Sequence, residues 1–143
     1  MTKSRIIVRV AFWAYASVWT VLLLVPEPGK LVVLRSVMPK SVVRDAGSWD
    51  KLIHASGYFA LGGLSLAAYG AGVEIGRWRW LAAACIAHGA LTEVGQTFVP
   101  PRRGEVADWL ADSAGVTLAT LLFILLSRVS NATRKTATEE VKG

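Results

Sequence analysis

The stretch from Leu91 to Gly115 holds most of the side chains in this sequence that could do chemistry. Apolar sequence flanks it on both sides, and a Pro100-Pro101 pair interrupts it. Its ionisable and amide residues are Glu93, Gln96, Arg102, Arg103, Glu105, Asp108 and Asp112. Ionisable groups inside or beside apolar helices are costly to keep there, so we expect a functional site in this stretch.

Three pairs of polar residues have the spacing of about one helical turn, which places both members of a pair on the same helix face. The pairs are Asp50 with His54, Glu93 with Gln96, and Asp108 with Asp112. If the helices that carry these pairs end at the same level, their polar faces meet. The sequence therefore predicts one polar pocket built from three helix ends.

The residue types in these pairs suit two kinds of chemistry. A histidine near a carboxylate, such as His54 with Glu93 or Asp108, can act as an acid–base pair, and Arg102 can hold a phosphate or carboxylate through two parallel hydrogen bonds. A metal ion bound by these carboxylates, Asp112 and His54 is conceivable. The ligands come from separate segments without a local motif such as His-Glu-x-x-His, so we expect no metal site and no cofactor.

The composition is that of a membrane protein. Of 143 residues, 53% are hydrophobic and 18% are charged, and the mean hydropathy is +0.44. Soluble domains carry about a quarter charged residues. The net charge is +6, but the basic residues are scattered at segment ends and form no stripe with interleaved aromatic residues, so we expect no nucleic-acid partner. The single Cys85 allows no internal disulfide.

Four apolar segments predict a single all-α domain, a four-helix transmembrane bundle with helices at about residues 6–25, 50–72, 80–98 and 105–126. The first segment lacks a small-residue cleavage site, which favours a retained helix over a signal peptide. Residues 26–49 are interpreted as either a short interfacial helix or a solvated loop. We expect a tight basic turn at residues 76–80 and a polar, disordered tail at residues 127–143.

Four spans place both termini on the same side of the membrane. The basic residues Lys3, Arg5 and Arg9 favour the cytoplasmic side, so we expect a multi-pass protein of the bacterial plasma membrane with both termini in the cytoplasm. The loop that contains Arg102 then faces outward, together with the polar pocket.

Each of these residues also has a purely structural interpretation. Ser48 or Asp50 could cap the second helix, and Asp108 could cap the fourth or pair with Arg102. Interhelical hydrogen bonds could explain the second-helix pair His54 and Tyr58, and they are the preferred role for His88. Glu93 needs a partner, for which the candidates are Arg102, Arg103 and His54.

Together these residues resemble the signature of the VanZ-like membrane proteins. The matching pattern is Asp50-Lys51-x-x-His54, then Glu93-x-x-Gln96-x-x-x-Pro100-x-Arg102, then Asp108 and Gly115. The resemblance covers about residues 10–126 and implies a four-helix integral membrane protein. It also implies kinship with the family's namesake, which gives low-level resistance to the lipid-bearing glycopeptide teicoplanin. The family usually has Asn at the position of Asp112, so an amide-specific hydrogen bond does not carry over to this chain.

We therefore expect an integral membrane protein whose outward pocket binds an amphiphilic ligand. Candidate ligands are a lipid head group, a lipid-linked cell-wall intermediate and a lipidated glycopeptide, in addition to the surrounding membrane lipids. The expected lining residues are Asp50, His54, Glu93, Gln96, Arg102 and Asp108. One alternative is a membrane enzyme with His54 and Glu93 as acid and base and Arg102 holding a lipid-linked anionic substrate. A second alternative is a structural subunit whose polar residues only tie helices together.

Overall fold

The computed structural model describes residues 2–26, 46–70 and 75–140, and the regular structure in these ranges is entirely helical. Four helices follow one another along the chain: α1 (Lys3–Leu24), α4 (Ala46–Tyr69), α5 (Ile75–Gln96) and α6 (Val106–Glu140). The described residues contain no strand, which confirms the all-α class. They form four long helices, the number predicted from the sequence.

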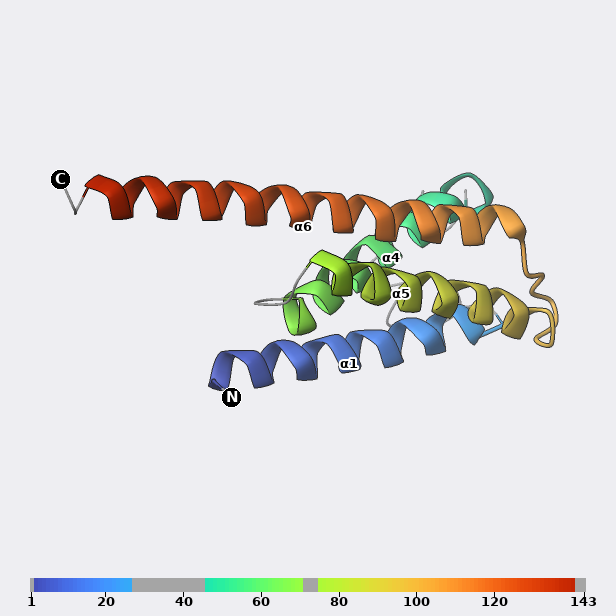
Figure 1. The fold of residues 1–143 in the computed structure, drawn as a ribbon. Coiled ribbons are helices and arrows are strands. Elements are labelled where there is room, and N and C mark those ends of the chain that lie inside the picture. The colour runs from blue at the N-terminus through green and yellow to red at the C-terminus, as the bar shows by residue number, and fades with distance from the viewer. Residues whose placement is uncertain (1, 27–45, 71–74, 141–143) are drawn as a thin grey trace.

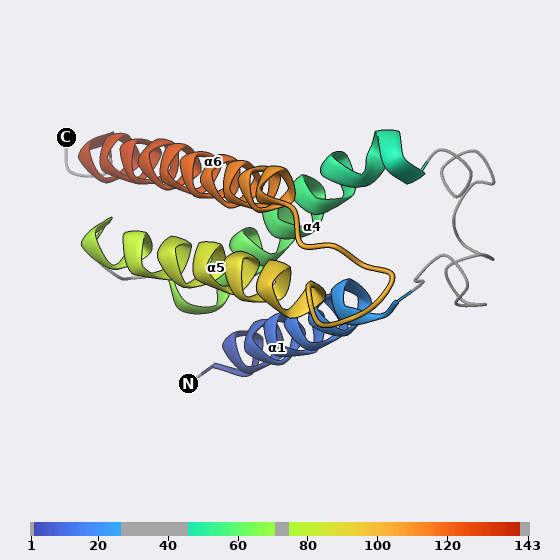
Figure 2. The ribbon, with the colours of Figure 1, turned by 90° about the vertical axis from the view of Figure 1, so that its right-hand side faces the viewer.

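The four helices run alternately up and down, the arrangement of an antiparallel helix bundle. Figure 1 shows α6 and α1 on the outside with α4 and α5 between them, and the N- and C-terminal ends pointing the same way. The end of α1, the start of α4 and the α5–α6 loop gather at the opposite end, which Figure 2 shows from another side. This opposite end is the one that collects the polar residues.

Helices α4 and α6 approach closely because small residues line their contact. A Cβ atom added to Gly115 of α6 would overlap the carbonyl oxygen of Ala55 and lie 2.9 Å from the backbone nitrogen of Phe59, both in α4. One turn further along, a Cβ on Gly62 would lie 3.4 Å from the Cα of Val116. Small side chains thus bring the two backbones together, as they do in many membrane helix pairs.

The apolar core is small and draws on all four helices. Its buried members are Leu23, Tyr58, Leu61, Cys85 and Val116. The outward surface of the bundle, by contrast, is rich in large apolar side chains. Exposed examples include Ile7, Val10, Trp13, Phe59, Leu91, Val94, Leu110, Leu118, Leu121 and Leu125.

Two of the described helices, Lys3–Leu24 and the Val106–Asn131 part of α6, are long and apolar enough to cross a membrane. The core helix of a soluble protein or a signal sequence can have the same length and composition, so length alone decides little. The four-span arrangement remains a proposal, argued below.

Several predicted boundaries were wrong. Helix α5 begins at Ile75, before the predicted basic turn, because Trp78 is buried and its Nε1 donates to the Gly70 carbonyl 3.0 Å away. Helix α6 continues to Glu140 and includes most of the predicted tail, since residues 127–140 contain neither proline nor glycine to stop it. Its C-terminal part extends beyond the other helices in Figure 1.

The predicted helix cap at Asp50 was also wrong. Helix α4 begins at Ala46, which places Asp50 in the second turn and not at the helix start. Helix α4 ends at Tyr69, close to the predicted end at about residue 72. The hypothesis of an interfacial helix or solvated loop concerns mainly residues 27–45, which lie outside the described residues.

Candidate functional site

Five polar side chains from three helices are buried near the α5–α6 loop. We call this set the polar cluster: His54 from α4, Glu93 and Gln96 from α5, and Asp108 and Asp112 from α6. Their exposed fractions are 2%, 7%, 2%, 3% and 0%, respectively. Three of the four ionisable members are carboxylic acids, so the cluster is acidic. Four of the predicted lining residues, His54, Glu93, Gln96 and Asp108, belong to this buried set.

His54 lies at the centre of the polar cluster. Its Nδ1 is 2.9 Å from Asp112 Oδ1 and 3.7 Å from Glu93 Oε1. The second carboxylate oxygen of Glu93, Oε2, accepts a 2.8 Å hydrogen bond from the backbone N–H of Glu105. One oxygen of Glu93 is therefore fixed by the start of the α6 segment, and the other faces the imidazole.

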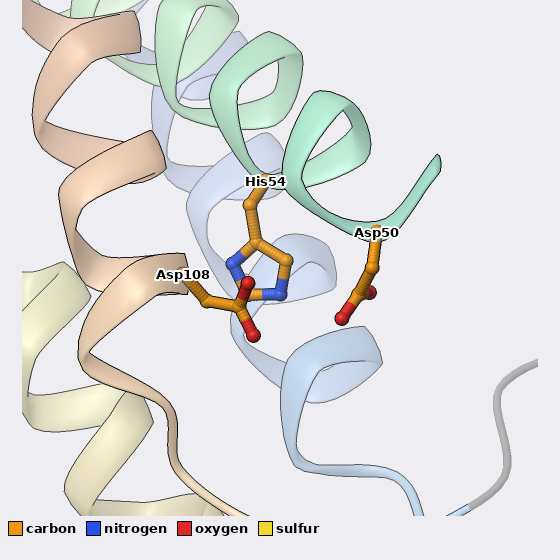
Figure 3. A group of neighbouring side chains, drawn as sticks. All are labelled: Asp50, His54 and Asp108. Carbon is orange, nitrogen blue, oxygen red and sulfur yellow. The ribbon is translucent and has the colours of Figure 1, made fainter. Parts of the chain in front are cut away.

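Asp50 and Asp108 lie near the other edge of the His54 ring. Figure 3 shows the imidazole between these two carboxylates, with one ring nitrogen turned toward the gap between them. One oxygen of each carboxylate and a nitrogen of His54 lie within 4.8 Å of one another. The imidazole thus has carboxylates from α4, α5 and α6 within reach, which is an arrangement able to hold a proton or a cation.

Asp108 is paired with Lys51. The Lys51 Nζ lies 2.9 Å from Asp108 Oδ1 and 3.4 Å from Glu105 Oε2. Asp108 also lies in the first turn of α6, where the positive end of the helix dipole favours a carboxylate. The structure therefore supports an ion pair for Asp108 but identifies Lys51, not Arg102, as the partner.

Arg102 contacts the backbone of α1. Its Nε donates to the Val25 carbonyl at 3.1 Å, and its Nη2 lies 3.5 Å from the Leu22 carbonyl. Both acceptors are at the C-terminal end of α1, where backbone carbonyls lack helical partners. Arg102 therefore fastens the α5–α6 loop to α1. Arg103, the other candidate partner of Glu93, is exposed.

A second hydrogen-bonded group lies deeper in the bundle and joins three helices. The Tyr58 hydroxyl is 2.9 Å from His88 Nδ1 and 3.0 Å from Thr92 Oγ1. His88 Nε2 is in turn 2.8 Å from Thr20 Oγ1 in α1. The interpretation of Tyr58 and His88 as interhelical hydrogen-bonding residues is confirmed.

Three buried polar atoms in the cluster have no hydrogen-bond partner among the described residues: Glu93 Oε1, Asp112 Oδ2 and Gln96 Nε2. Buried polar atoms are normally satisfied, so such atoms call for a water, a ligand or an ion. The backbone of Gly89 lies directly against Asp112, since a Cβ there would be 3.0 Å from Asp112 Oδ2. Any larger residue at position 89 would press on this carboxylate.

A cavity of about 240 Å³ lies beside the cluster, between the end of α5 and the start of α6. Glu93 belongs both to the cavity wall and to the polar cluster, so the cavity adjoins the buried side chains. The lining residues are Ala90, Glu93, Val94, Thr97, Gly104, Glu105, Val106 and Trp109.

The contacts of two residues near the site were not predicted from the sequence. Asp112 was placed on the face of Asp108 but was left out of the expected pocket, although it is the nearest partner of His54. No partner was predicted for Lys51, which pairs with Asp108. The helical spacing of Asp112 from Asp108 could have placed Asp112 in the site. Nothing in the sequence indicated that Lys51 pairs with Asp108.

Comparison with models of known protein families, with curated proteins and with solved structures gave no match to this chain.

Proposed function

We propose that this chain is a VanZ-like, multi-pass membrane protein that binds an amphiphilic ligand of the cell envelope beside the polar cluster. The observation that carries the proposal is the inverted polarity of the bundle. Charged and amide side chains lie inside it, and large apolar side chains cover its outer surface. A soluble helical protein has the opposite arrangement, because water drives its apolar side chains inward.

The burial of the two helices that are long and apolar enough to cross a membrane supports this interpretation. Only 6% of the apolar window of α1 and 22% of that of α6 are buried inside the bundle. A core helix of a soluble protein is mostly buried. Helices α4 and α5 also carry exposed apolar residues, such as Leu52 and Phe59 on α4 and Leu91 and Val94 on α5. We infer that all four helices face lipid and cross the membrane.

The same arrangement supports a retained α1. Its Leu23 belongs to the buried core, and the backbone carbonyls of Leu22 and Val25 receive Arg102. A cleaved signal peptide would remove these contacts. With both termini at one end of the bundle and basic residues at the start of α1, we place the termini in the cytoplasm and the polar cluster near the outer surface.

The cavity beside Glu93 suits one end of an amphiphile. Val94, Val106 and Trp109 offer apolar contact, while Glu93 and Glu105 offer acceptors for hydroxyl or ammonium donors. Its volume of about 240 Å³ is below the roughly 300–1,000 Å³ of sites that enclose a whole small molecule. We therefore propose that a head group enters the cavity while the ligand's tail stays in lipid. The candidate ligands are a lipid head group, a lipid-linked cell-wall intermediate and a lipidated glycopeptide.

The convergence of the VanZ-like pattern adds support. Its separated parts, on α4, α5 and the start of α6, lie next to one another in the structure. Asp50, His54, Glu93, Gln96 and Asp108 gather around the start of α6, and Gly115 forms the tight contact between α4 and α6. Residues far apart in sequence thus share one region, as a common binding role requires.

Antibiotic susceptibility tests this function. The wild-type chain, Glu93→Gln and an exposed control, Arg128→Gln, would be produced at matched membrane levels in a sensitive Gram-positive host. We expect protection against teicoplanin but not against vancomycin, which lacks the lipid tail, and we expect Glu93→Gln to lose it while Arg128→Gln keeps it. Equal susceptibility of the wild type and the empty vector would reject a teicoplanin-binding role.

A membrane enzyme acting on a lipid-linked anionic substrate is the second candidate. The contact that favours it is the 2.9 Å pairing of His54 with Asp112, because a carboxylate that orients an imidazole is a common arrangement in acid–base catalysis. Mass spectrometry of lipids extracted from producing cells separates the two functions. An enzyme changes the mass of a lipid species in a His54-dependent way, whereas a binder leaves all lipid masses unchanged.

A further inference from the structure

We propose that His54, Glu93 and Asp112 form a binding site for a divalent transition-metal ion, with Zn²⁺ as the preferred ion. The site lies at the meeting point of α4, α5 and α6, inside the bundle. It goes beyond the proposed amphiphile binding and does not depend on it, since the ion contacts only side chains of this chain. The sequence analysis expected no metal because no two ligands form a local motif.

The chemistry of the donor atoms favours this class of ion. An imidazole nitrogen and two carboxylate oxygens suit zinc and its neighbours in the first transition row, whereas Mg²⁺ and Ca²⁺ prefer ligand sets made of oxygen alone. Two ionised carboxylates also match the charge of a divalent ion. The three ligands therefore favour a transition-metal ion over Mg²⁺ and Ca²⁺, and their charge matches that of the ion.

The spacing of the donor atoms fits a single ion. Donors about 2.0–2.2 Å from a tetrahedral Zn²⁺ are about 3.3–3.6 Å from one another. Nδ1 of His54 lies 2.9 Å from Asp112 Oδ1 and 3.7 Å from Glu93 Oε1, so the observed separations bracket this range. One atom from each of the three residues lies within 4.8 Å of the other two. Shifts of a few tenths of an ångström bring both imidazole–carboxylate separations into this range.

Unsatisfied atoms independently indicate a missing partner. Glu93 Oε1 faces His54 and has no hydrogen-bond donor among the described residues, and neither has Asp112 Oδ2. The two residues are 7% and 0% exposed. A buried carboxylate oxygen without a donor loses its hydration and gains nothing in return, and a coordinated cation would supply the compensation.

Two surrounding contacts hold the ligands in position. The backbone N–H of Glu105 binds Glu93 Oε2 at 2.8 Å and so turns Oε1 toward the imidazole. The backbone of Gly89 supports Asp112 from the opposite side. Such outer contacts orient metal ligands in known sites. Glu93, one of the three ligands, also lines the neighbouring cavity.

The neighbouring group of Asp50, His54 and Asp108 is the weaker candidate. Its Asp108 is already bound to Lys51 Nζ at 2.9 Å, so an ion there would have to displace or repel an ammonium. The ammonium also leaves Asp108 neutralised without a metal. Among the described residues, the ion-pair partner of both Glu93 and Asp112 is His54, and no lysine or arginine is paired with either carboxylate.

Metal binding to the purified full chain tests the site. The protein would be purified in detergent with a tag free of histidine, stripped with a chelator, dialysed against ZnCl₂, and assayed for zinc by mass spectrometry. We expect one Zn²⁺ per chain. Glu93→Gln and Asp112→Asn should each weaken zinc binding at least about tenfold, the lower bound seen even for changes to outer contacts in metal sites.

Glu140→Gln is the control, because it removes one carboxylate at the C-terminal end of α6, far from the α5–α6 loop beside the site. It should bind zinc as the wild type does, and MgCl₂ should not compete. Both ligand variants keep the shape of the side chain, and helical circular dichroism checks that they fold. A wild-type chain that retains no zinc would overturn the proposal, as would Glu93→Gln and Asp112→Asn variants that bind zinc like the wild type.

Discussion

The substitution Gly115→Ala should destabilise the bundle, because α4 and α6 touch through this glycine. The added Cβ would overlap the Ala55 carbonyl oxygen and lie 2.9 Å from the Phe59 nitrogen and 3.0 Å from the Ala55 carbonyl carbon. All three are backbone atoms of α4, so no side-chain rotation relieves the contact. The helices must instead move apart and disturb the polar cluster above them.

The magnitude follows from two opposing effects. Alanine in place of glycine inside a helix stabilises it by up to about 1 kcal/mol. Overpacking a well-filled contact costs about 1–3 kcal/mol, and clashes with backbone belong at the upper end. We expect Gly115→Ala to lower the free energy of unfolding by about 2 kcal/mol. Gly63→Ala should raise it by about 0.5–1 kcal/mol, because a Cβ there meets nothing within 4 Å.

Cys85 supplies the assay, because it is the one cysteine of the chain and is 5% exposed within the core. Its reaction with a maleimide in mixed micelles of increasing SDS content reports unfolding without an added probe. The order of stability should be Gly63→Ala first, then the wild type, then Gly115→Ala. If Gly115→Ala resisted SDS as well as Gly63→Ala, the close contact between α4 and α6 would be wrong.

Three further predictions use the same chain. Tyr58→Phe should lower stability by about 1 kcal/mol in the Cys85 assay, because it removes a buried hydroxyl bonded to Thr92, and unchanged stability would contradict that network. Arg102→Lys should also cost about 1 kcal/mol, since one ammonium cannot copy the fork that reaches α1, and full retention of stability would show that the α1 contact is unimportant. A reporter enzyme fused after Gly143 should be active only in the cytoplasm, and activity outside the membrane would reverse the proposed orientation.

Long apolar runs in the sequence predicted the presence of the helices well. Helix boundaries that depend on single contacts were predicted poorly. The four helices follow from four apolar segments. The start of α5 depends on the indole of Trp78, which reaches back to the Gly70 carbonyl, and hydropathy does not register such a contact. The end of α6 was misplaced because polar composition was taken as a stop signal, whereas a helix continues until a backbone feature breaks it.

The partners within the site were harder to predict than its members. Helical spacing placed His54, Glu93 and Asp108 at one level. It did not reveal that Lys51 pairs with Asp108 or that Arg102 reaches α1, because both depend on the relative register of the helices. The contact between Gly115 and Ala55 sets that register for α4 and α6. A glycine in the sequence shows that close approach is possible, not which residue it approaches.

The identity of residue 112 decides how the polar cluster balances its charge. Lys51 neutralises Asp108, which leaves Glu93 and Asp112 to share His54. Even a fully protonated imidazole cancels only one of these two buried carboxylates, and an uncompensated buried charge is strongly unfavourable. An asparagine at this position would leave Glu93 as the one buried carboxylate beside His54, and a protonated His54 would balance it. The aspartate of this chain therefore adds a second buried carboxyl group, whose charge either a proton or the proposed divalent cation must balance. The cation would also coordinate the unpartnered Oε1 of Glu93.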